Sequence, residues 1–206
     1  MPDDSGTRSV KIGSDERTGW SSDRPRREGG PERKPDISVR GRVLKPTDRL
    51  RYTPGSLVLV AAPDRSAADD YLHTVLEDRA ALLSRGRVER LLKGRADEDQ
   101  IATVLDAAVT RRLNAGDAVV LVLGDLDAET REHWLRAAHA LRRPRHLVLL
   151  DGSGGDDADR EALGELRKAL MADKLGDEGF HTAIRLGGSA ANEVKRIVFR
   201  SPPKDD

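Results

Sequence analysis

The sequence predicts an α/β protein with a three-layer arrangement: a parallel β-sheet with helices on both faces, preceded by a disordered tail. Three continuous apolar runs, rich in Val and Leu, have the length of strands that are buried on both faces. Segments with apolar residues at helical spacing stand between these runs. An alternation of buried strands and amphipathic helices is typical of a parallel sheet covered on both sides.

The composition limits the functions that the chain can have. Its 206 residues suit one domain with a tail, and 36 basic residues balance 36 acidic ones, so no overall field attracts nucleic acid or an anionic membrane. The absence of cysteine excludes disulfides, thiolate metal sites and a cysteine nucleophile. No apolar run approaches the roughly 20 residues of a membrane helix, and no secretory signal is visible. We therefore expect a cytoplasmic protein with no membrane contact.

The first segment, residues 1–37, is rich in Gly, Ser, Pro, Asp and Arg and has few large apolar side chains. Such a segment buries too little surface to offset the entropy lost on ordering, so we expect it to be disordered. Its basic and acidic residues are interspersed, which argues against a nucleic-acid-binding arm. A folded domain over 38–200 and a flexible tail over 201–206 are expected to follow.

The first half of this domain contains one strand and two helices. Residues 56–62, SLVLVAA, form the first buried run. Residues 66–83 carry apolar side chains near helical spacing and predict a helix. A second helix is predicted over 99–113, and Gly116 supplies its stop.

The next apolar run, residues 118–123 (AVVLVL), predicts a second strand. Asp127 is expected to cap the helix that follows, and Pro144 ends it. Residues 146–150, HLVLL, predict a third strand. We expect SLVLVAA at the centre of the sheet with AVVLVL and HLVLL as its flanking strands.

The last part of the domain begins with a loop over 151–157, DGSGGDD. A helix is predicted over 159–171 from its apolar face. Short edge strands are expected over 182–186 and 196–199, with a turn of helix over 190–194 between them.

Residues 42–70, RVLKPTDRLRYTPGSLVLVAAPDRSAADD, carry a resemblance to a known family. The segment resembles the start of bacterial P-loop ATP-binding proteins of the zeta-toxin and polynucleotide-kinase-like type, in which a similar strand runs into a G-x-x-x-x-G-K-[ST] loop. The stretch 178–199 is similar to their closing strand-turn-strand. The resemblance implies a P-loop kinase-like fold over 42–199, with a nucleotide site at the loop after the first strand.

The loop departs from the family's motif at every signature position. The two glycine positions fall on Ala62 and Ala67, the lysine position on Ala68 and the hydroxyl position on Asp69. Glycines let backbone N–H groups wrap phosphate, the lysine neutralises phosphate charge, and the hydroxyl holds Mg²⁺. The resemblance therefore implies a degenerate phosphate loop, in which Arg65 is the remaining cation.

Asp69 and Asp70 are expected in the first turn of the following helix. A helix N-terminus favours anions, so these carboxylates would take the place of a phosphate. The alternative is that they serve only as good first-turn residues. Arg65 offsets part of their charge, or it is simply solvated, as a single arginine in a loop usually is.

Two more departures concern catalysis. Kinases of this type carry an acid after the second strand, to orient or deprotonate the acceptor hydroxyl. The corresponding stretch here, 84–93, contains only Glu89 and no clear strand. The family's arginine-bearing lid is replaced by the short loop after the third strand, with Arg160, Arg167 and Lys168 on the next helix as partial substitutes.

Carboxylates at strand ends supply the remaining candidates. Asp125 and Asp127 follow the second buried run, where a P-loop protein holds a magnesium-binding carboxylate. The alternative is that Asp125 forms a turn and Asp127 a helix cap. Asp151 ends the third run at the edge where α/β proteins bind ligands, and further carboxylates follow it at Asp156, Asp157 and Asp159. Asp125 and Asp151 are thus the catalytic candidates, and the loop lacks the spacing of a calcium hand.

Other site types have no support in the sequence. The five histidines form neither an H-x-x-x-H pair nor an H-E-x-x-H motif, so no metal site is expected. Ser153 does not stand in a G-x-S-x-G elbow. Aromatic residues make up 3% of the chain, too few for a platform that stacks single-stranded nucleic acid.

These observations favour a non-catalytic binding or scaffold protein on a P-loop kinase-like fold, with a protein partner that the sequence does not identify and no cofactor. The alternative is a divergent enzyme that binds ATP and Mg²⁺ and transfers phosphate to a small molecule or a polynucleotide end. That enzyme would need another cation, such as Arg65 or Arg160, in place of the missing lysine.

Overall fold

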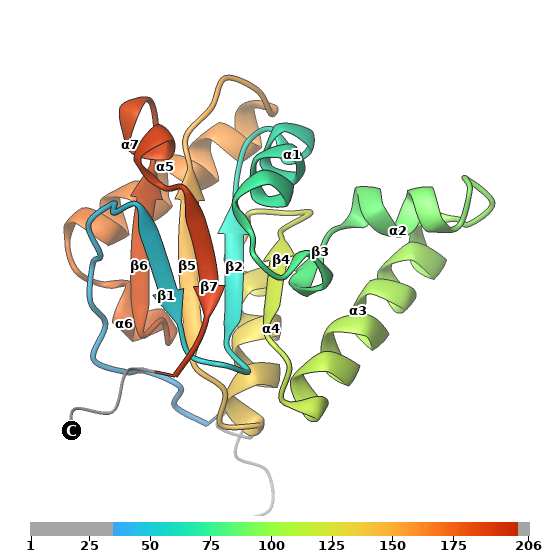
Figure 1. Ribbon diagram of the computed structural model, residues 1–206, viewed down its shortest axis with the longest axis horizontal. Helices are drawn as coiled ribbons and strands as arrows, with labels where there is room; N and C mark the ends of the chain where they lie inside the picture. Colours follow the sequence, from blue (N-terminus) through green and yellow to red (C-terminus); the bar gives the residue numbers. More distant parts are fainter. Residues whose placement is uncertain (1–34, 202–206) are drawn as a thin grey trace, which may run out of the picture. The chain divides into compact units, whose positions relative to one another are not determined.

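The computed structural model describes residues 35–201 (Figure 1). The predicted disordered tail lies outside this range except for its last three residues, and the predicted C-terminal tail except for its first. From Asp36 onward the chain is one compact unit. Ile37 is buried in its core.

Helices and strands alternate along this unit. In chain order they are β1 (Arg49–Tyr52), β2 (Leu57–Ala61), α1 (Arg65–Val75), the short 3-10 helix η1 (Arg79–Ala81), β3 (Leu82–Leu83), α2 (Arg85–Leu91), α3 (Glu98–Ala115), β4 (Val119–Val122), α4 (Ala128–Ala140), β5 (Arg145–Leu150), α5 (Asp157–Met171), α6 (Leu175–Glu178), β6 (Thr182–Leu186), α7 (Ser189–Glu193) and β7 (Arg196–Phe199).

The main sheet has five parallel strands in the order β3-β4-β2-β5-β6. Strand β2 lies at its centre, where Leu57 is in register with Val119 of β4 and with Arg145 of β5. All five residues of β2 are buried, as expected for a strand covered on both faces. The predicted central strand and both of its predicted neighbours are confirmed.

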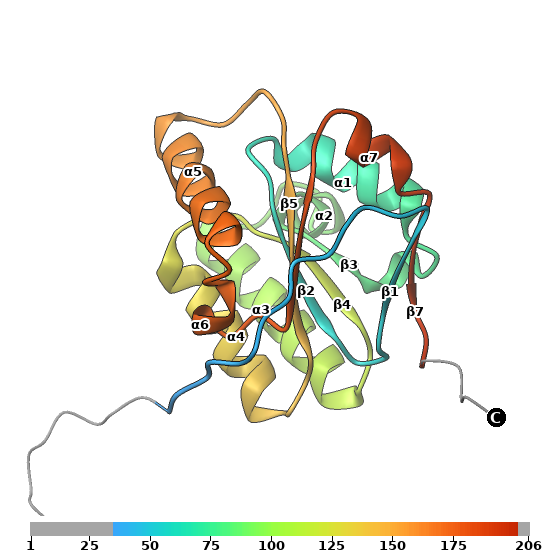
Figure 2. The same ribbon diagram turned by 90° about the vertical axis from the view of Figure 1, so that its left-hand side faces the viewer.

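The two faces of this sheet carry separate cores, because successive side chains of a strand point to opposite sides. Leu57 and Leu59 of β2 pack with α3, α4, α5 and α6, whereas Val58 and Val60 pack with α1, α7, β1 and β7. Figure 2 shows these two groups on opposite sides of the sheet. The chain is therefore an α/β protein with helices on both faces of a parallel sheet.

A second, two-stranded sheet covers part of one face, which the sequence did not predict. Strand β7, expected at the edge of the main sheet, instead pairs in parallel with β1. The alternation in β1 explains the arrangement, because Leu50 and Tyr52 are buried while Arg49 and Arg51 are exposed. The prediction that residues 196–199 form a strand is confirmed, but the strand belongs to the second sheet and not to the edge of the main sheet.

The prediction of one helix over 66–83 is also wrong, because the helix ends earlier. Helix α1 stops at Val75, and Leu76 forms an isolated bridge with Ile197 beside β7. Asp78 then caps the turn of η1, and Leu82 enters the main sheet as part of β3. The sequence pattern did not indicate this break, because the apolar residues stay near helical spacing and β3, with only 2 residues, is too short to show the pattern of a strand.

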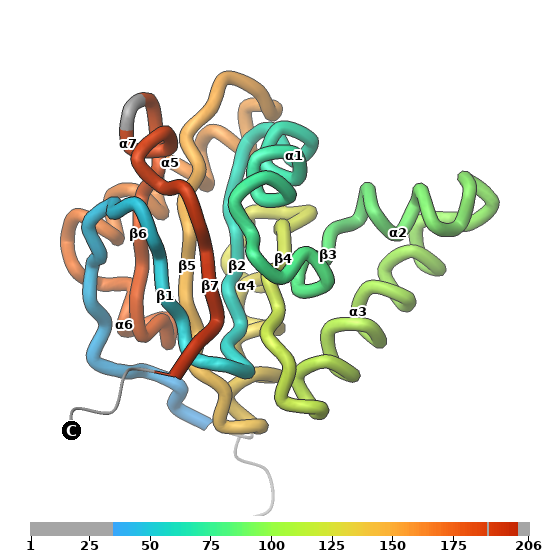
Figure 3. The backbone as a smooth tube through the Cα atoms, viewed as in Figure 1, coloured from blue at the N-terminus to red at the C-terminus, as the bar shows by residue number. Residues whose placement is uncertain are grey.

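The order of the strands places a crevice between β2 and β4. From the end of β2 the chain passes β4 to reach β3, whereas from the end of β4 it passes β2 to reach β5, so the two connections run in opposite directions along the sheet. Connections that diverge in this way open a crevice at the carboxyl ends of the two strands, where α/β proteins bind ligands. Helices α2 and α3 extend away from the sheet on the β3 side of this crevice (Figure 3).

Candidate functional site

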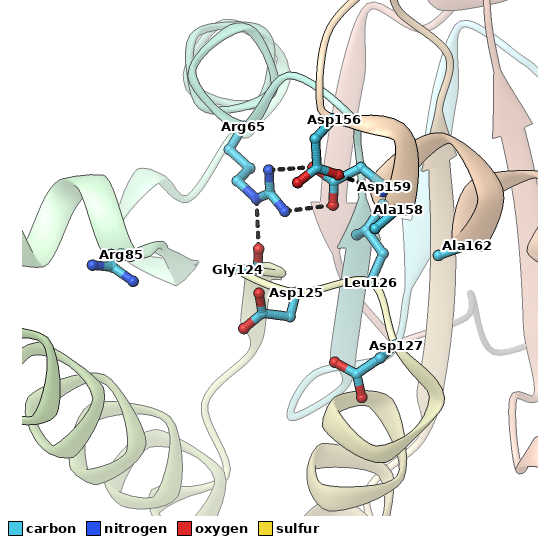
Figure 4. A pocket seen from close by; sticks show the side chains of 10 residues that line it. All are labelled: Arg65, Arg85, Gly124, Asp125, Leu126, Asp127, Asp156, Ala158, Asp159 and Ala162. Carbon is cyan, nitrogen blue, oxygen red and sulfur yellow. Dashed lines mark hydrogen bonds and ion pairs between the residues drawn. The ribbon is translucent and has the colours of Figure 1, made fainter.

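A polar hollow of about 530 Å³ lies at the carboxyl ends of β2 and β4 (Figure 4). Its charged lining comes from the starts of helices and from the loop after β4, and consists of Arg65, Arg85, Asp125, Asp127, Asp156 and Asp159. We call this space the acidic hollow, because its lining has more carboxylates than guanidinium groups.

A second hollow of about 380 Å³ adjoins it and shares Arg65, Arg85 and Gly124. Its further charged lining includes Asp69 and Arg90. We call this space the Asp69 hollow, and the two hollows together the cleft. The cleft lies at the crevice that the strand order predicts.

Arg65 is the central cation of the cleft, and all of its contacts are internal. Its Nη1 and Nη2 donate to the two carboxylate oxygens of Asp159 at 2.8 and 2.7 Å, and its Nε donates to the carbonyl oxygen of Gly124 at 2.6 Å (Figure 4). These hydrogen bonds to the Asp159 carboxylate raise the pKa of Arg65. Arg65 therefore joins the start of α1 to the start of α5 and to the loop after β4.

The connection from β2 to α1 is too short for a phosphate loop. Only residues 62–64 separate the two elements, and Ala62 is buried at the strand's end. The other aligned positions, Ala67 and Ala68, lie inside α1, and Ala68 packs into the core. A loop that wraps phosphate with successive backbone N–H groups needs those residues outside the helix.

The start of α1 is capped by a residue that the sequence analysis missed. The carboxylate of Asp64 accepts a hydrogen bond from the Ala67 backbone N–H at 2.9 Å. An aspartate directly before a helix is a strong capping signal, so this residue could have been found from the sequence. The helix N-terminus therefore has its own anion, as expected, but a different residue supplies it.

The prediction for Asp69 and Asp70 was wrong, because neither lies in the first turn of α1. Asp69 lies in the second turn and is buried, with 7% of its surface exposed. Its Oδ2 accepts a hydrogen bond from the Ser84 hydroxyl at 2.6 Å. Asp70 is exposed on the same helix. The helix begins earlier than the motif alignment assumed, which moves both residues one turn inward.

Ser84 occupies the place of the acid that follows the second strand in the resembled kinases. It comes directly after β3, caps α2 by accepting from the Arg87 N–H at 3.2 Å, and donates to Asp69. Glu89, the acid predicted for this stretch, accepts from Arg85 at 2.8 Å and lines the Asp69 hollow. The buried carboxylate nearest to this strand end therefore belongs to α1.

The carboxylates of the acidic hollow differ in how they are used. Asp127 caps α4 through the backbone N–H and hydroxyl of Thr130, both at 2.8 Å, and these hydrogen bonds lower the pKa of Asp127. Asp156 caps α5 by accepting from the Asp159 N–H at 2.8 Å. Asp125 is exposed and makes no hydrogen bond or ion pair with residues 35–201. It is the carboxylate of this hollow that remains open to a ligand.

Asp151, the second catalytic candidate, does not line either hollow. Its Oδ1 accepts from Arg167 at 2.6 and 3.0 Å, and its Oδ2 accepts from Arg185 at 2.7 Å. The structure thus places Asp151 between α5 and β6 as a bridge, whereas it brings Asp125 into the cleft.

The cations proposed as substitutes for a phosphate-binding lysine are also paired. Arg160 contacts Asp157 on its own helix, and Lys168 donates to Glu165 at 2.7 Å. Neither lines the two hollows. Arg85, which the sequence analysis did not single out, does line both and contacts Glu98 and Glu89, and its hydrogen bonds to these two carboxylates raise its pKa.

Metal coordination has no geometric support in the described part of the chain. Among residues 35–201, no three His, Asp or Glu side chains are arranged to hold a metal ion. His146 is buried at the other end of the sheet, where its ring nitrogens contact Thr182 at 2.8 Å and Ser56 at 3.3 Å. Burial lowers the pKa of His146 to about 3, so this ring is neutral.

The fold and the cleft define the chain as an α/β protein with a five-stranded parallel sheet and a polar, mainly acidic cleft at its carboxyl edge. Compared with models of known protein families and with curated proteins, the chain shows no match. None of the helices within residues 35–201 is long and apolar enough to cross a bilayer.

Proposed function

We propose that this chain is a non-catalytic binding protein on a P-loop kinase-like fold, with the cleft as its binding groove. The observation that carries the proposal is that Arg65 pairs with other groups of the protein. This side chain, the cation nearest to the expected phosphate position, forms a two-pronged pair with Asp159 and a third hydrogen bond to Gly124. Three of its five N–H donors and its charge are therefore already engaged within the protein.

The backbone around this position supports the same conclusion. A phosphate at the start of α1 would compete with the Asp64 carboxylate for the Ala67 N–H, while the Ala68 N–H already donates to the Asp64 carbonyl at 3.0 Å. Because the capping carboxylate is negative, it would also repel the ligand. The N–H groups of Ala67 and Ala68 at the start of α1 are thus satisfied internally.

The charge of the cleft argues against a triphosphate. Its lining holds six carboxylates and three guanidinium groups: Asp69, Glu89, Asp125, Asp127, Asp156 and Asp159 against Arg65, Arg85 and Arg90. Clefts lined by one sign of charge concentrate ligands of the other sign. The position of the cleft, at the crevice of a parallel sheet, supports binding as its role.

A divergent phosphotransferase remains the second candidate, because of Asp125. This carboxylate follows β4, where a P-loop enzyme holds its magnesium-binding acid, and no described side chain pairs with it. The enzyme would need a phosphate-binding cation, for which Arg85 or Arg90 of the Asp69 hollow would have to leave its present carboxylate partners.

Calorimetry with ATP and Mg²⁺ separates the two candidates. We expect the full-length chain to bind ATP–Mg²⁺ more weakly than about 1 mM and to show no change in Tm at lower concentrations. Tight, magnesium-dependent binding that is lost in Asp125→Asn, but kept in the exposed control Asp70→Asn, would contradict the non-catalytic proposal and favour the phosphotransferase.

A further inference from the structure

Strands β1 and β7 form a two-stranded ribbon whose outer side carries arginines. Arg49 of β1 is in register with Arg196 of β7, and Arg51 stands two residues further along β1, so all three side chains point to the same side. All three are exposed, whereas Leu50 faces the core. Val198, in register with Arg51, is 2% exposed, so the open part of this side consists of the long arginine side chains. Figure 2 shows the ribbon at the margin of the molecule, across the main sheet from α3, α4, α5 and α6.

The register of the ribbon places like charges directly opposite each other. Cross-strand neighbours of the same charge destabilise a sheet, and Arg49 and Arg196 are such a pair. Among residues 35–201, no side-chain hydrogen bond or ion pair involves any of the three arginines. The nearest carboxylates along the chain, Asp48 and Glu193, are exposed and do not pair with them. The described part of the protein therefore leaves this repulsion uncompensated.

A hollow of about 340 Å³ beside Arg196 extends the positive surface. Its charged lining consists of Lys195, Arg196, Arg200 and Glu77, and Glu77 already pairs with Arg200. Charges of one sign around a concave surface attract ligands of the other sign. We call this hollow and the outer side of the ribbon together the basic surface. It is distinct from the cleft, because none of its charged residues lines either hollow there.

The kind of anion follows from the spacing of the arginines. Residues two apart on a strand are separated by about 6.6 Å, which is also the separation of alternate side chains in an extended peptide. Acidic side chains at alternate positions of such a peptide would meet Arg49 and Arg51, and guanidinium groups bind carboxylates through paired hydrogen bonds. Single-stranded nucleic acid fits less well, because the aromatic side chains of the ribbon, Tyr52 and Phe199, pack toward the core and offer bases no surface for stacking.

We propose that the basic surface docks an extended acidic segment of a partner protein, whose carboxylates contact Arg49, Arg51 and Arg196. An anion placed there relieves the repulsion between the facing arginines, which a neutral segment does not. The inference goes beyond the proposed function, because it adds a second binding surface outside the cleft. Since the contacts are open to solvent, the attraction should weaken as the salt concentration rises.

Titration of the full-length protein, followed by NMR and calorimetry, tests the proposal. The probe is an acetylated peptide amide that alternates glutamate with threonine, and its analogue with glutamine in place of glutamate has the same shape without the charge. We expect the acidic peptide to bind with Kd on the order of 1 mM at low salt. Binding should be at least about tenfold weaker at about 0.5 M salt, and at least about tenfold weaker for the glutamine peptide at low salt.

Matched variants locate the surface. Arg49→Gln combined with Arg196→Gln should weaken binding of the acidic peptide about tenfold, because it removes two of the three guanidinium groups. Arg95→Gln combined with Arg111→Gln removes the same charge from exposed arginines at and before α3, and should change Kd less than about twofold. All four positions are exposed, so both double variants should fold.

A second measurement tests the repulsion itself. Arg196→Glu turns the facing pair into one of opposite charge, so it should raise Tm by about 1–3 °C relative to Arg111→Glu. The same substitution should abolish binding of the acidic peptide. A Tm no higher than that of the Arg111 variant would show that the facing arginines do not repel each other, which removes the reason for a ligand.

Other outcomes would also overturn the inference. Absence of binding by the acidic peptide, equal binding of the glutamine peptide, or equal losses in the two double variants would leave the basic surface as a solvated face. Tighter binding of a uridine oligonucleotide of the same charge would assign the surface to nucleic acid. Tighter peptide binding by a chain shortened after Ser201 would assign it to Asp205 and Asp206 of the chain itself. The proposed function is tested separately, because the ATP–Mg²⁺ experiment concerns binding that depends on Asp125 in the cleft.

Discussion

Arg65 and Asp159 form a two-pronged ion pair that ties the first residue of α1 to the first turn of α5, with distances of 2.8 and 2.7 Å. The Asp159 side chain is 11% exposed and that of Arg65 is 37% exposed. The pair therefore closes one wall of the cleft with groups that a phosphate-binding protein would leave free for its ligand.

Breaking this pair should destabilise the fold. Arg65→Ala leaves the buried Asp159 carboxylate without its partner, and we expect the free energy of unfolding to fall by about 2 kcal/mol, below the value for fully buried pairs because Arg65 is partly solvated. Urea denaturation measures the change, with Arg111→Ala, an exposed arginine of α3, as the control. A loss no larger than that of the control would show that the pair contributes little.

Ala68→Lys, which restores the signature lysine, should not create a nucleotide site. Ala68 is 2% exposed and packs against the core inside α1, so a lysine there is buried. We expect a loss of about 2–4 kcal/mol in the free energy of unfolding and no gain in ATP binding. Ala67→Lys places the same residue on the exposed side of the same helix and should change stability by about 0.5 kcal/mol or less. Equal effects of the two substitutions would contradict the packing of α1.

His146 should make the fold sensitive to acid. Burial, with a smaller contribution from the nearby His181, lowers the pKa of His146 to about 3, whereas the unfolded chain retains the ordinary value of 6.5. Between these values the unfolded state binds more protons, so stability falls as the pH decreases. We expect a loss of about 2–3 kcal/mol between about pH 7 and about pH 4.5.

The measurement for this prediction is the free energy of unfolding as a function of pH. His146→Gln should flatten the curve over that window, whereas His73→Gln, at an exposed site on α1, should leave its slope unchanged. A slope that persists in the His146 variant would assign the acid sensitivity to other groups.

Arg145 should be replaceable without loss of stability. It is 2% exposed, and among residues 35–201 its Nε and Nη1 have no hydrogen-bond partner while its Nη2 donates only to the Ile37 carbonyl at 3.3 Å. Because an unpaired buried charge is costly, Arg145→Met should leave the free energy of unfolding unchanged or raise it by about 1 kcal/mol. The exposed Arg142→Met controls for net charge, and a loss of more than about 1 kcal/mol relative to it would show that the guanidinium stabilises the fold.

The sequence predicted the parts of the fold that depend on local pattern. Continuous apolar runs identified the three central strands, because strands of a parallel sheet are buried on both faces. It also predicted the cap at Asp127 and the stop at Gly116, where the backbone has the left-handed conformation, since capping depends on residues close in the chain. Asp64 carried the same kind of signal and could have been predicted in this way.

The tertiary structure alone decided the pairings over long distance in the chain. Strands β1 and β7, and the pair of Arg65 with Asp159, join segments far apart in sequence, and no local period indicates such contacts. Asp69 lies in the second turn of α1 because only three residues separate β2 from this helix. The motif alignment does not show where the helix begins. The pattern of the residues thus determined which segments form strands and helices. Packing determined which charged side chains pair within the protein and which, like Asp125, pair with none of residues 35–201, because burial and pairing arise only when distant elements meet.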